Sequence, residues 1–290
     1  MTASGPWLAA VGAAVSAAVG LWACGGGGGV STLEQARAQG VLRVGYANEA
    51  PFAYRDTASG RLTGEAPEIA RVVADRLGID RIDGVLTEFG ALIPGLQAGR
   101  FDVIAAGMYV TPERCRQVAF STPTYSVGEA FIVPAGNPLA LHGYDDVVRS
   151  GTATLGVVTG TIERTYALAS GIPEARVVTF PDAPSAMAGV KAGRVSAYGA
   201  TELTVQDLLA RDASGLAQAR PFEDPVIDGV RVRGHGAFAF RPGDDALRAA
   251  FDGVLESFLG SPDHLALVRP FGFTEDQLPG AADAAALCGS

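Results

Sequence analysis

The chain has 290 residues, of which 48% are hydrophobic and 18% are charged, and its formal net charge at pH 7 is -9. This composition is typical of a globular protein, long enough for two lobes with sizeable cores, and it excludes a largely disordered chain. The negative charge argues against nucleic acid as a partner, because binding to nucleic acid requires a basic face.

The first 29 residues are interpreted as a targeting segment and not as part of the fold. Residues 7–23 are apolar and rich in alanine, too short for a convincing membrane-spanning helix, and Cys24 and five glycines follow them. This order resembles a bacterial lipoprotein signal, in which the cysteine carries the lipid and the glycines form a tether, although the segment has no Lys or Arg and Trp22 is bulky for its position. We expect export, with a lipid on Cys24 as the contact with the membrane.

From residue 31 onward, helical patterns alternate with short apolar strands. Glycines and prolines mark most of the boundaries between them. The expected elements are helix 31–39, strand 41–46, hairpin 55–63, helix 66–78, strand 84–88, helix 91–98 and strand 101–105. This strand–helix alternation predicts an α/β lobe in which helices cover the faces of a parallel sheet.

Chemically useful side chains follow the last of these strands. After a glycine break comes Tyr109, then a helix start in which Thr111 is the expected N-cap, and then Arg114. In open α/β sheets ligands collect outside the carboxyl ends of the strands, so an aromatic face and a guanidinium fork at this place indicate a small-molecule site.

The loops after the other two strands contribute further candidates. Glu49 and Phe52 follow the first strand, and Phe89 follows the second. Consecutive elements are usually neighbours in space, so the three strand ends are expected to converge. A purely structural interpretation stays open for each residue: Arg114 could form a surface ion pair, and the phenylalanines could be ordinary core residues.

The second half of the chain repeats the α/β pattern and then returns to the first lobe. Its expected elements are strand 129–133, linker 134–138, strand 154–158, helix 162–170, strand 176–180, helix 184–192, strand 195–199, helix 202–210, strand 236–240, and helices 245–259 and 262–268. We expect lobe 1 to comprise residues 30–133 plus 240–290, and lobe 2 residues 134–239. Two crossings between lobes form a hinge, and hinged lobes close on ligands.

The remaining cysteines form an even pair if Cys24 carries lipid. In an oxidising compartment disulfides persist, and we favour a bridge between Cys115 and Cys288 that pins the C-terminal tail to the helix carrying Arg114. Two separate buried thiols are the alternative.

Patterns for catalysis or metal binding are sparse. His142, His235 and His264 are scattered, without metal-ligand spacing or a nearby cysteine. The glycine run at 25–29 does not follow a strand, so it is not a phosphate-binding loop, and no G-x-S-x-G motif is present. We expect no catalytic residue, no metal and no cofactor.

Several stretches resemble the periplasmic solute-binding proteins of polar amino acid type ABC importers: "VGYANEAPF", "TEFGALIPGLQAGRFD", "AAGMYVTPERCRQVAFSTP" and "AFIVPAGNP". A narrower similarity, to the ectoine/hydroxyectoine-binding members, rests on "ANE.PF", "E.GA.IPGLQAGR", "PERC" and a cysteine near the C-terminus. The resemblance implies a bilobal type II periplasmic-binding fold, an extracytoplasmic monomer, and the membrane subunits of an ABC permease as partner.

The same resemblance implies a zwitterionic ligand and a role for each candidate. Arg114 would hold the carboxylate, Glu49 would accept hydrogen bonds from a ring-delocalised cation, and an aromatic box would consist of Phe52, Phe89 and Tyr109. In the second lobe, Thr161 and Glu163 stand in the loop that closes over the ligand, with Ile162 where the family has threonine.

Two other functions stay open. A polar or cationic amino acid would need a carboxylate for its ammonium group; where amino-acid-binding relatives place an aspartate, this chain has Thr201, although Glu202 or Glu163 could substitute. The enzymatic alternative is a periplasmic dehydratase of the same fold, with Glu163 or Glu49 as general acid or base.

Overall fold

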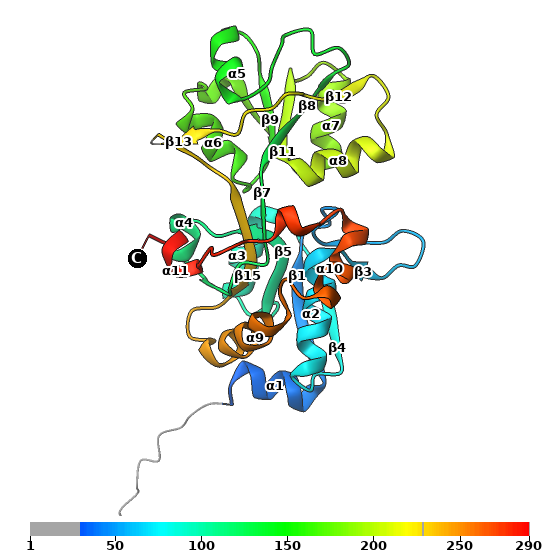
Figure 1. Cartoon of the computed structure of the whole chain (residues 1–290), viewed down its shortest axis with the longest axis vertical. Helices are drawn as coiled ribbons and strands as arrows, with labels where there is room; N and C mark the ends of the chain where they lie inside the picture. The colour runs from blue at the N-terminus through cyan, green and yellow to red at the C-terminus, as the bar shows by residue number, and fades with distance from the viewer. Residues whose placement is uncertain (1–29, 228, 290) are drawn as a thin grey trace, which may run out of the picture.

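The computed structural model describes residues 30–227 and 229–289, which form two lobes joined by two crossing segments (Figure 1). Cys24 and the rest of the expected targeting segment lie outside the described residues, so lipidation stays a prediction. Within the described residues, no helix combines the length and the apolar composition that crossing a membrane requires.

The first lobe is built on a six-stranded sheet in the order β4-β1-β5-β15-β6, with β7 also paired to β15. The strands are β1 (Val41–Tyr46), β4 (Arg81–Leu86), β5 (Val103–Tyr109), β6 (Ala119–Phe120), β7 (Tyr125–Val127) and β15 (Gly234–Phe240). Strands β4, β1 and β5 are parallel, as predicted, but β15 runs antiparallel to β5. The reason is that β15 enters from the other lobe, so its amino end lies at the cleft where the parallel strands have their carboxyl ends.

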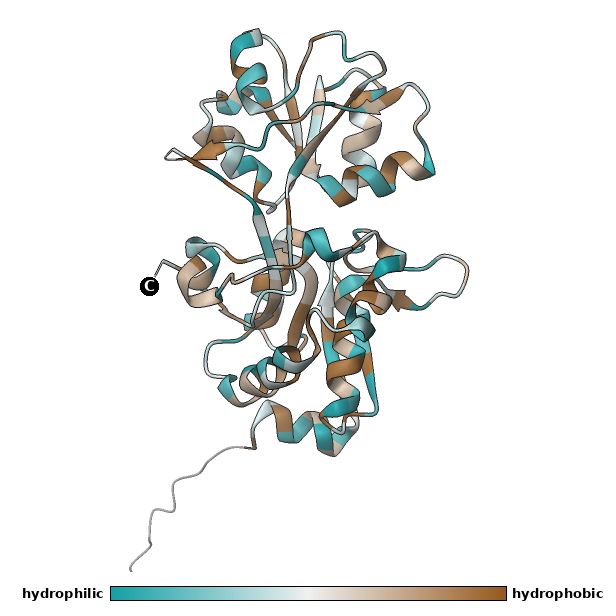
Figure 2. Cartoon of the chain, viewed as in Figure 1, coloured by the Kyte–Doolittle hydropathy of each residue, from teal (hydrophilic) through white to brown (hydrophobic). Residues whose placement is uncertain are grey.

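Helices cover this sheet, and the two longest, α2 and α9, bury an apolar face. They are α1 (Thr32–Gln39), α2 (Glu65–Arg76), η1 (Phe89–Ala91), α3 (Leu92–Gln97), α4 (Pro112–Cys115), α9 (Asp245–Phe258), α10 (Pro262–Val268), η3 (Arg269–Phe271), η4 (Glu275–Gln277) and α11 (Ala284–Leu287), with the hairpin β2 (Tyr54–Arg55) and β3 (Leu62–Thr63). In α9 the apolar residues recur every three or four positions, so Leu247, Phe251, Leu255 and Phe258 are all buried. Figure 2 shows this banding of hydrophobic and hydrophilic residues along α9.

The strand that leads to the site differs from its prediction. Instead of ending at Ala105 before a glycine break, β5 continues to Tyr109. Gly107 has a φ of +66°, and the pairing with β15 shifts register beside it, so the glycine forms an irregularity within the strand. A Cβ at Gly107 would lie 2.6 Å from Cδ1 of Phe52, so only glycine lets that ring pack against the strand.

The second lobe has a five-stranded sheet in the order β10-β9-β11-β8-β12 and a separate hairpin. The strands are β8 (Glu129–Pro134), β9 (Leu155–Val158), β10 (Val177–Phe180), β11 (Ala197–Thr201), β12 (Leu216–Gln218), β13 (Val226–Ile227) and β14 (Val230–Arg231). The helices are α5 (Tyr144–Ser150), α6 (Glu163–Ala169), η2 (Glu174–Arg176), α7 (Ala183–Lys191) and α8 (Glu202–Arg211). Strands β9, β10 and β11 are parallel, while β8 runs antiparallel to β11 because it carries the chain away from the cleft.

The strand pairing shows that the chain crosses between the lobes at other positions than predicted. Strand β7 belongs to the first sheet and β8 to the second, so the outward crossing falls at Gly128, before the boundary expected between 133 and 134. All of β15 pairs in the first sheet, so the return crossing falls before Gly234, and not at 239–240. The backbone N–H of Glu129 donates to Oδ1 of Asp224 at 2.7 Å, which ties the outward crossing to the returning chain.

The predicted disulfide is confirmed: Cys115 at the end of α4 is bonded to Cys288, 173 positions away, with their Cα atoms 5.7 Å apart. Helix α11, just before Cys288, packs Ala284 and Leu287 against the same hydrophobic cluster as Cys115. The C-terminus is thereby attached to the short helix that carries Arg114.

Candidate ligand-binding site

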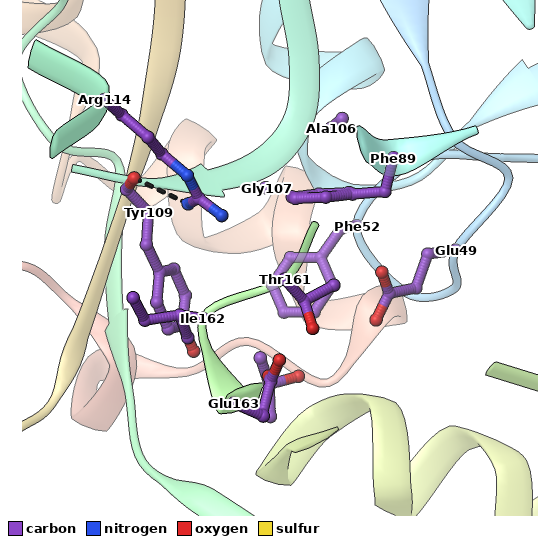
Figure 3. A pocket seen from close by; sticks show the side chains of 11 residues that line it. Glu49, Phe52, Phe89, Ala106, Gly107, Tyr109, Arg114, Thr161, Ile162 and Glu163 are labelled. Atoms are coloured by element: carbon purple, nitrogen blue, oxygen red, sulfur yellow. Dashed lines mark hydrogen bonds between the residues drawn. The ribbon is translucent and has the colours of Figure 1, made fainter. Parts of the chain in front are cut away.

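A cavity lies between the two lobes. The structure brings all seven predicted ligand-binding residues to it, and the full lining is Glu49, Phe52, Phe89, Ala106, Gly107, Tyr109, Arg114, Thr161, Ile162, Glu163 and Thr201. The cavity is therefore lined by both lobes (Figure 3).

Arg114 is held in place by its own short helix. Its backbone N–H donates to Oγ1 of Thr111, which confirms the predicted N-cap. The buried guanidinium donates from Nη1 to the carbonyl oxygen of Tyr109 at 2.9 Å and from Nη2 to the carbonyl oxygen of Gly160 at 3.0 Å. Burial lowers the pKa of Arg114, but a guanidinium remains charged in proteins, so the cavity contains a fixed cation.

Three aromatic rings border the cavity on different sides (Figure 3). The ring of Phe89 lies 5.5 Å from the guanidinium carbon of Arg114, a cation–π distance. Phe52 is also a core residue, because its ring centroid lies 5.1 Å from that of Tyr125 and 5.6 Å from that of Phe273. For Phe52 the core and site interpretations both hold.

Two carboxyl groups, one from each lobe, line the same cavity as the Arg114 guanidinium. Glu163, at the start of α6, is only 4% exposed, and its Oε2 has no hydrogen-bond partner among the described residues. Oε1 of Glu49 accepts a hydrogen bond from the Thr204 hydroxyl at 2.8 Å. Burial raises the pKa of Glu163, and it raises that of Glu49 to about 7. Two carboxyl groups and one guanidinium therefore share the cavity.

The loop before α6 brings Thr161 and Ile162 to the cavity. The N-cap of α6 is Ile162, without a side-chain hydrogen bond, and Thr161 instead donates from Oγ1 to the carbonyl oxygen of Val158 at 2.9 Å. Thr161 therefore lines the cavity but is not the helix cap. A Cβ on Gly160 would lie 2.5 Å from Cα of Gly90, so two glycines meet across the cleft and let the lobes approach closely.

Thr201 lines the cavity but was not among the predicted ligand-binding residues. Its Oγ1 accepts from the N–H of Thr204 and so caps α8. Its position, where amino-acid-binding relatives place an aspartate, was the sequence signal for the site, although a threonine before a helix is also a common cap. Glu202, proposed as a substitute carboxylate, does not line the cavity, and its Oε1 accepts from Nε2 of Gln206.

His264 and His142 lie close to backbone groups away from the cavity. Nδ1 of His264 accepts from the N–H of Gly260, and Nδ1 of His142 lies 2.9 Å from the carbonyl oxygen of Pro221. In the part of the chain that the structure describes, no group of three or more His, Cys, Asp or Glu residues is arranged to hold a metal ion.

Comparison with known proteins identifies the family. Residues 42–271 match the bacterial extracellular solute-binding proteins, family 3. A probable amino-acid ABC transporter periplasmic-binding protein of Sinorhizobium fredii (strain NBRC 101917 / NGR234) is 37% identical over 273 residues, which cover 93% of this chain and 90% of that protein.

Two solved structures extend the comparison. EhuB in complex with hydroxyectoine is 35% identical, with a TM-score of 0.76, covering 89% of this chain and 95% of that one. The ancestral amino acid-binding protein AncCDT-1, described as a precursor of cyclohexadienyl dehydratase, is 26% identical, with a TM-score of 0.72, covering 83% and 99%.

The chain therefore belongs to the bacterial extracellular solute-binding proteins, family 3, with the type II periplasmic-binding fold. It is an extracytoplasmic solute-binding protein of an ABC importer, a class that binds small ligands and pairs with permease subunits. The resemblance seen in the sequence is confirmed for the family, the fold and the class of protein.

Proposed function

We propose that the protein captures a small zwitterionic compatible solute of the ectoine/hydroxyectoine type and delivers it to its permease. Arg114 holds the carboxylate; Phe52, Phe89 and Tyr109 enclose a ring-delocalised cation; and Glu49, Glu163 and Thr161 supply hydrogen-bonding groups. The observation that carries the proposal is the composition of one cavity: a buried guanidinium, two acids and three aromatic rings.

The unpartnered atoms of the cavity support a polar ligand. The Tyr109 hydroxyl and Oε2 of Glu163 are buried without a hydrogen-bond partner among the described residues. Buried polar groups are normally satisfied, so a ligand with donors would complete both.

The binding free energy at such a site can be estimated from its individual contacts. A cation over an aromatic face contributes about 0.5–2 kcal/mol, and each charge-assisted hydrogen bond about 1.5–3 kcal/mol. A few such terms, less the cost of ordering the ligand and the lobes, reach the roughly 8 kcal/mol of a micromolar complex.

A thermal-shift panel tests the ligand class. Ectoine and hydroxyectoine are expected to raise the melting temperature, whereas betaine, which lacks a ring, and the amino acids arginine, lysine and glutamine are expected to shift it less. A larger shift with an amino acid than with ectoine rejects the ectoine assignment.

A polar or cationic amino acid is the second candidate. The Sinorhizobium fredii relative is described as a probable amino-acid-binding protein, which favours it. Thr201 offers no carboxylate to an α-ammonium group, so Glu163 or Glu49, which both line the cavity, would have to do so. The same panel separates the two candidates.

We further propose that the protein is a carrier and not a dehydratase. Carboxyl groups with raised pKa values, such as Glu49, would suit general acid–base chemistry, and AncCDT-1 connects this fold with a dehydratase. Ligand recovered unchanged after long incubation supports the carrier, and conversion to a dehydrated product supports the enzyme.

Two features of the whole protein belong to the same proposal. We propose a lipid on Cys24, which a Cys24→Ser variant tests: wild type should partition with detergent from cell extracts, and the variant should not.

A monomer is also proposed, and light scattering of the purified protein should give about the mass of one chain.

A further inference from the structure

Two threonine hydroxyl groups of the second lobe form a hydrogen-bonded chain that ends on Glu49 of the first lobe. Oγ1 of Thr201 donates to Oγ1 of Thr204 at 2.9 Å, and Oγ1 of Thr204 donates to Oε1 of Glu49 at 2.8 Å. Thr204 is fully buried, and it belongs to the second lobe, whereas Glu49 belongs to the first.

The protons in this chain are ordered in one direction. Each threonine hydroxyl has one proton to donate. Thr201 donates its proton to Oγ1 of Thr204, and its oxygen accepts the N–H of Thr204. Thr204 donates its own proton to Oε1 of Glu49. A hydrogen bond of this kind favours the ionised carboxylate.

The helix that carries Thr204 is also fixed to the hinge. The N–H of Glu202, the first residue of α8, donates to the carbonyl oxygen of Gly128 at 2.9 Å. Gly128 is the residue at which the chain crosses between lobes. In the arrangement of the lobes that the structure describes, the start of α8 therefore lies against Glu49 of the first lobe.

We propose that Thr204 is a positioning residue. Its hydroxyl donates a hydrogen bond across the cleft to Glu49 and holds that side chain as an ionised acceptor. Closure of the lobes therefore also stabilises the negative charge that meets the ligand's cation. This inference rests on the proposed function, in which a cation binds beside Glu49.

The other groups around Glu49 oppose that charge. Burial raises the pKa of Glu49 most, and Glu163 on α6 raises it further, while Thr204 lowers it. Glu129 on β8 also repels it, and the phenols of Tyr125 on β7 and Tyr198 on β11 face it as neutral groups. Among these neighbours, Thr204 is the one whose hydrogen bond favours the charged form.

The experiment compares Thr204→Val, which keeps the shape and removes the hydroxyl, with Thr204→Ser, which keeps the hydroxyl. Thr159→Val is the matched control, because the Thr159 hydroxyl bonds within the second lobe, to the carbonyl oxygen of Phe180 at 3.2 Å. Ligand dissociation constants are measured by calorimetry from pH 5.5 to 9, using the compound that gives the largest thermal shift.

Thr204→Val is expected to weaken binding about tenfold at pH 7 and to move the pH midpoint upward, because Glu49 then ionises less readily. Thr204→Ser and Thr159→Val should follow the wild-type curve. A loss that is equal at every pH marks a merely structural role and overturns the proposal, as does a Thr204→Val curve that overlays the wild type.

A second readout needs no ligand. The carboxyl carbon of Glu49 is titrated by ¹³C NMR in the ligand-free protein, assigned by its absence in Glu49→Gln. Thr204→Val should raise the apparent pKa of Glu49, and an unchanged value contradicts the proposal. If no compound binds the wild type, the proposed ligand fails while this titration still decides the role of Thr204.

Discussion

The guanidinium of Arg114, in the first lobe, donates a hydrogen bond from Nη2 to the carbonyl oxygen of Gly160, in the second lobe, at 3.0 Å. With the bond from Nη1 to Tyr109, this engages two of the five N–H donors of the side chain and leaves three for a ligand. Arg114 thus contributes both to the contact between the lobes and to the proposed recognition of a carboxylate.

Arg114→Lys keeps a positive charge but loses the planar fork. If the ligand's carboxylate is held by two parallel hydrogen bonds, the lysine variant should bind at least about tenfold more weakly, and Arg114→Ala about 100-fold or more. Calorimetry measures both. Arg116→Lys, on an exposed neighbouring arginine, is the control, and equal affinity for wild type and Arg114→Ala would remove the carboxylate contact from the account.

Phe89→Leu preserves apolar volume and removes the aromatic face. A lost cation–π contact of about 0.5–2 kcal/mol corresponds to about a 2- to 30-fold weaker dissociation constant. Phe222→Leu, in the core of the second lobe against Phe131, should leave the affinity unchanged. Phe52 is a poorer choice for this test because its packing on Tyr125 and Phe273 also stabilises the fold. Wild-type affinity in Phe89→Leu would reject the aromatic box.

The affinity for a cationic group should depend on pH. Burial raises the pKa of Glu49 to about 7, so this carboxyl is increasingly protonated below pH 7 and no longer attracts the cation. The dissociation constant should therefore rise as the pH falls from about 8 to 6. Calorimetry across this range checks the slope, and Glu49→Gln should flatten it. A wild-type profile that is flat between pH 6 and 8 would contradict this role for Glu49.

Glu65 gives a prediction about stability that does not involve the ligand. This first residue of α2 is 1% exposed, and burial raises its pKa from an ordinary 4.5 to about 7, with Thr124 offsetting only part of the effect. Between these values the folded state binds more protons than the unfolded state, so stability declines as the pH rises from about 4.5 to 7.

Glu65→Gln mimics the protonated form and should remove this decline. The variant should melt at a higher temperature than the wild type at pH 8 and at a similar temperature at pH 4.5, as measured by calorimetric melting. A variant that is less stable than the wild type at pH 8 would show that the carboxylate is needed in its charged form.

The disulfide should contribute both stability and order near Arg114. Cys115→Ala with Cys288→Ala frees the C-terminal tail, and loss of a bridge that closes a long loop typically costs about 2–5 kcal/mol. Denaturant unfolding measures this loss. Because Cys115 adjoins Arg114, ligand affinity should fall as well; an unchanged affinity would mean that Thr111 and the contacts of the guanidinium suffice to position it.

Local patterns were enough to predict the first-lobe side of the site. Glu49, Phe89 and Arg114 follow strands whose carboxyl ends share one edge of a parallel sheet, so the order of elements alone brings them together. The cap at Thr111 also followed from residue type and spacing, because a helix cap depends on few long-range contacts. The disulfide spans 173 positions, and it was predicted from the two cysteines that remain if Cys24 carries lipid.

The remaining features depend on contacts between distant segments. The continuation of β5 past Gly107 is possible because β15 pairs beside it, and β15 comes from beyond the second lobe. The contact between Thr204 and Glu49 spans 155 positions, and a threonine in the first turn of a helix carries no signal of a partner in another lobe. The lobe boundaries were predicted at the wrong positions because an apolar strand has the same sequence pattern in either sheet.

The most direct test of the central claim is a calorimetric titration of the purified protein with ectoine at pH 8. The account predicts saturable one-to-one binding in the micromolar range or tighter, lost in Arg114→Ala. No heat of binding with ectoine or hydroxyectoine, together with tight binding of an amino acid such as arginine, would contradict it.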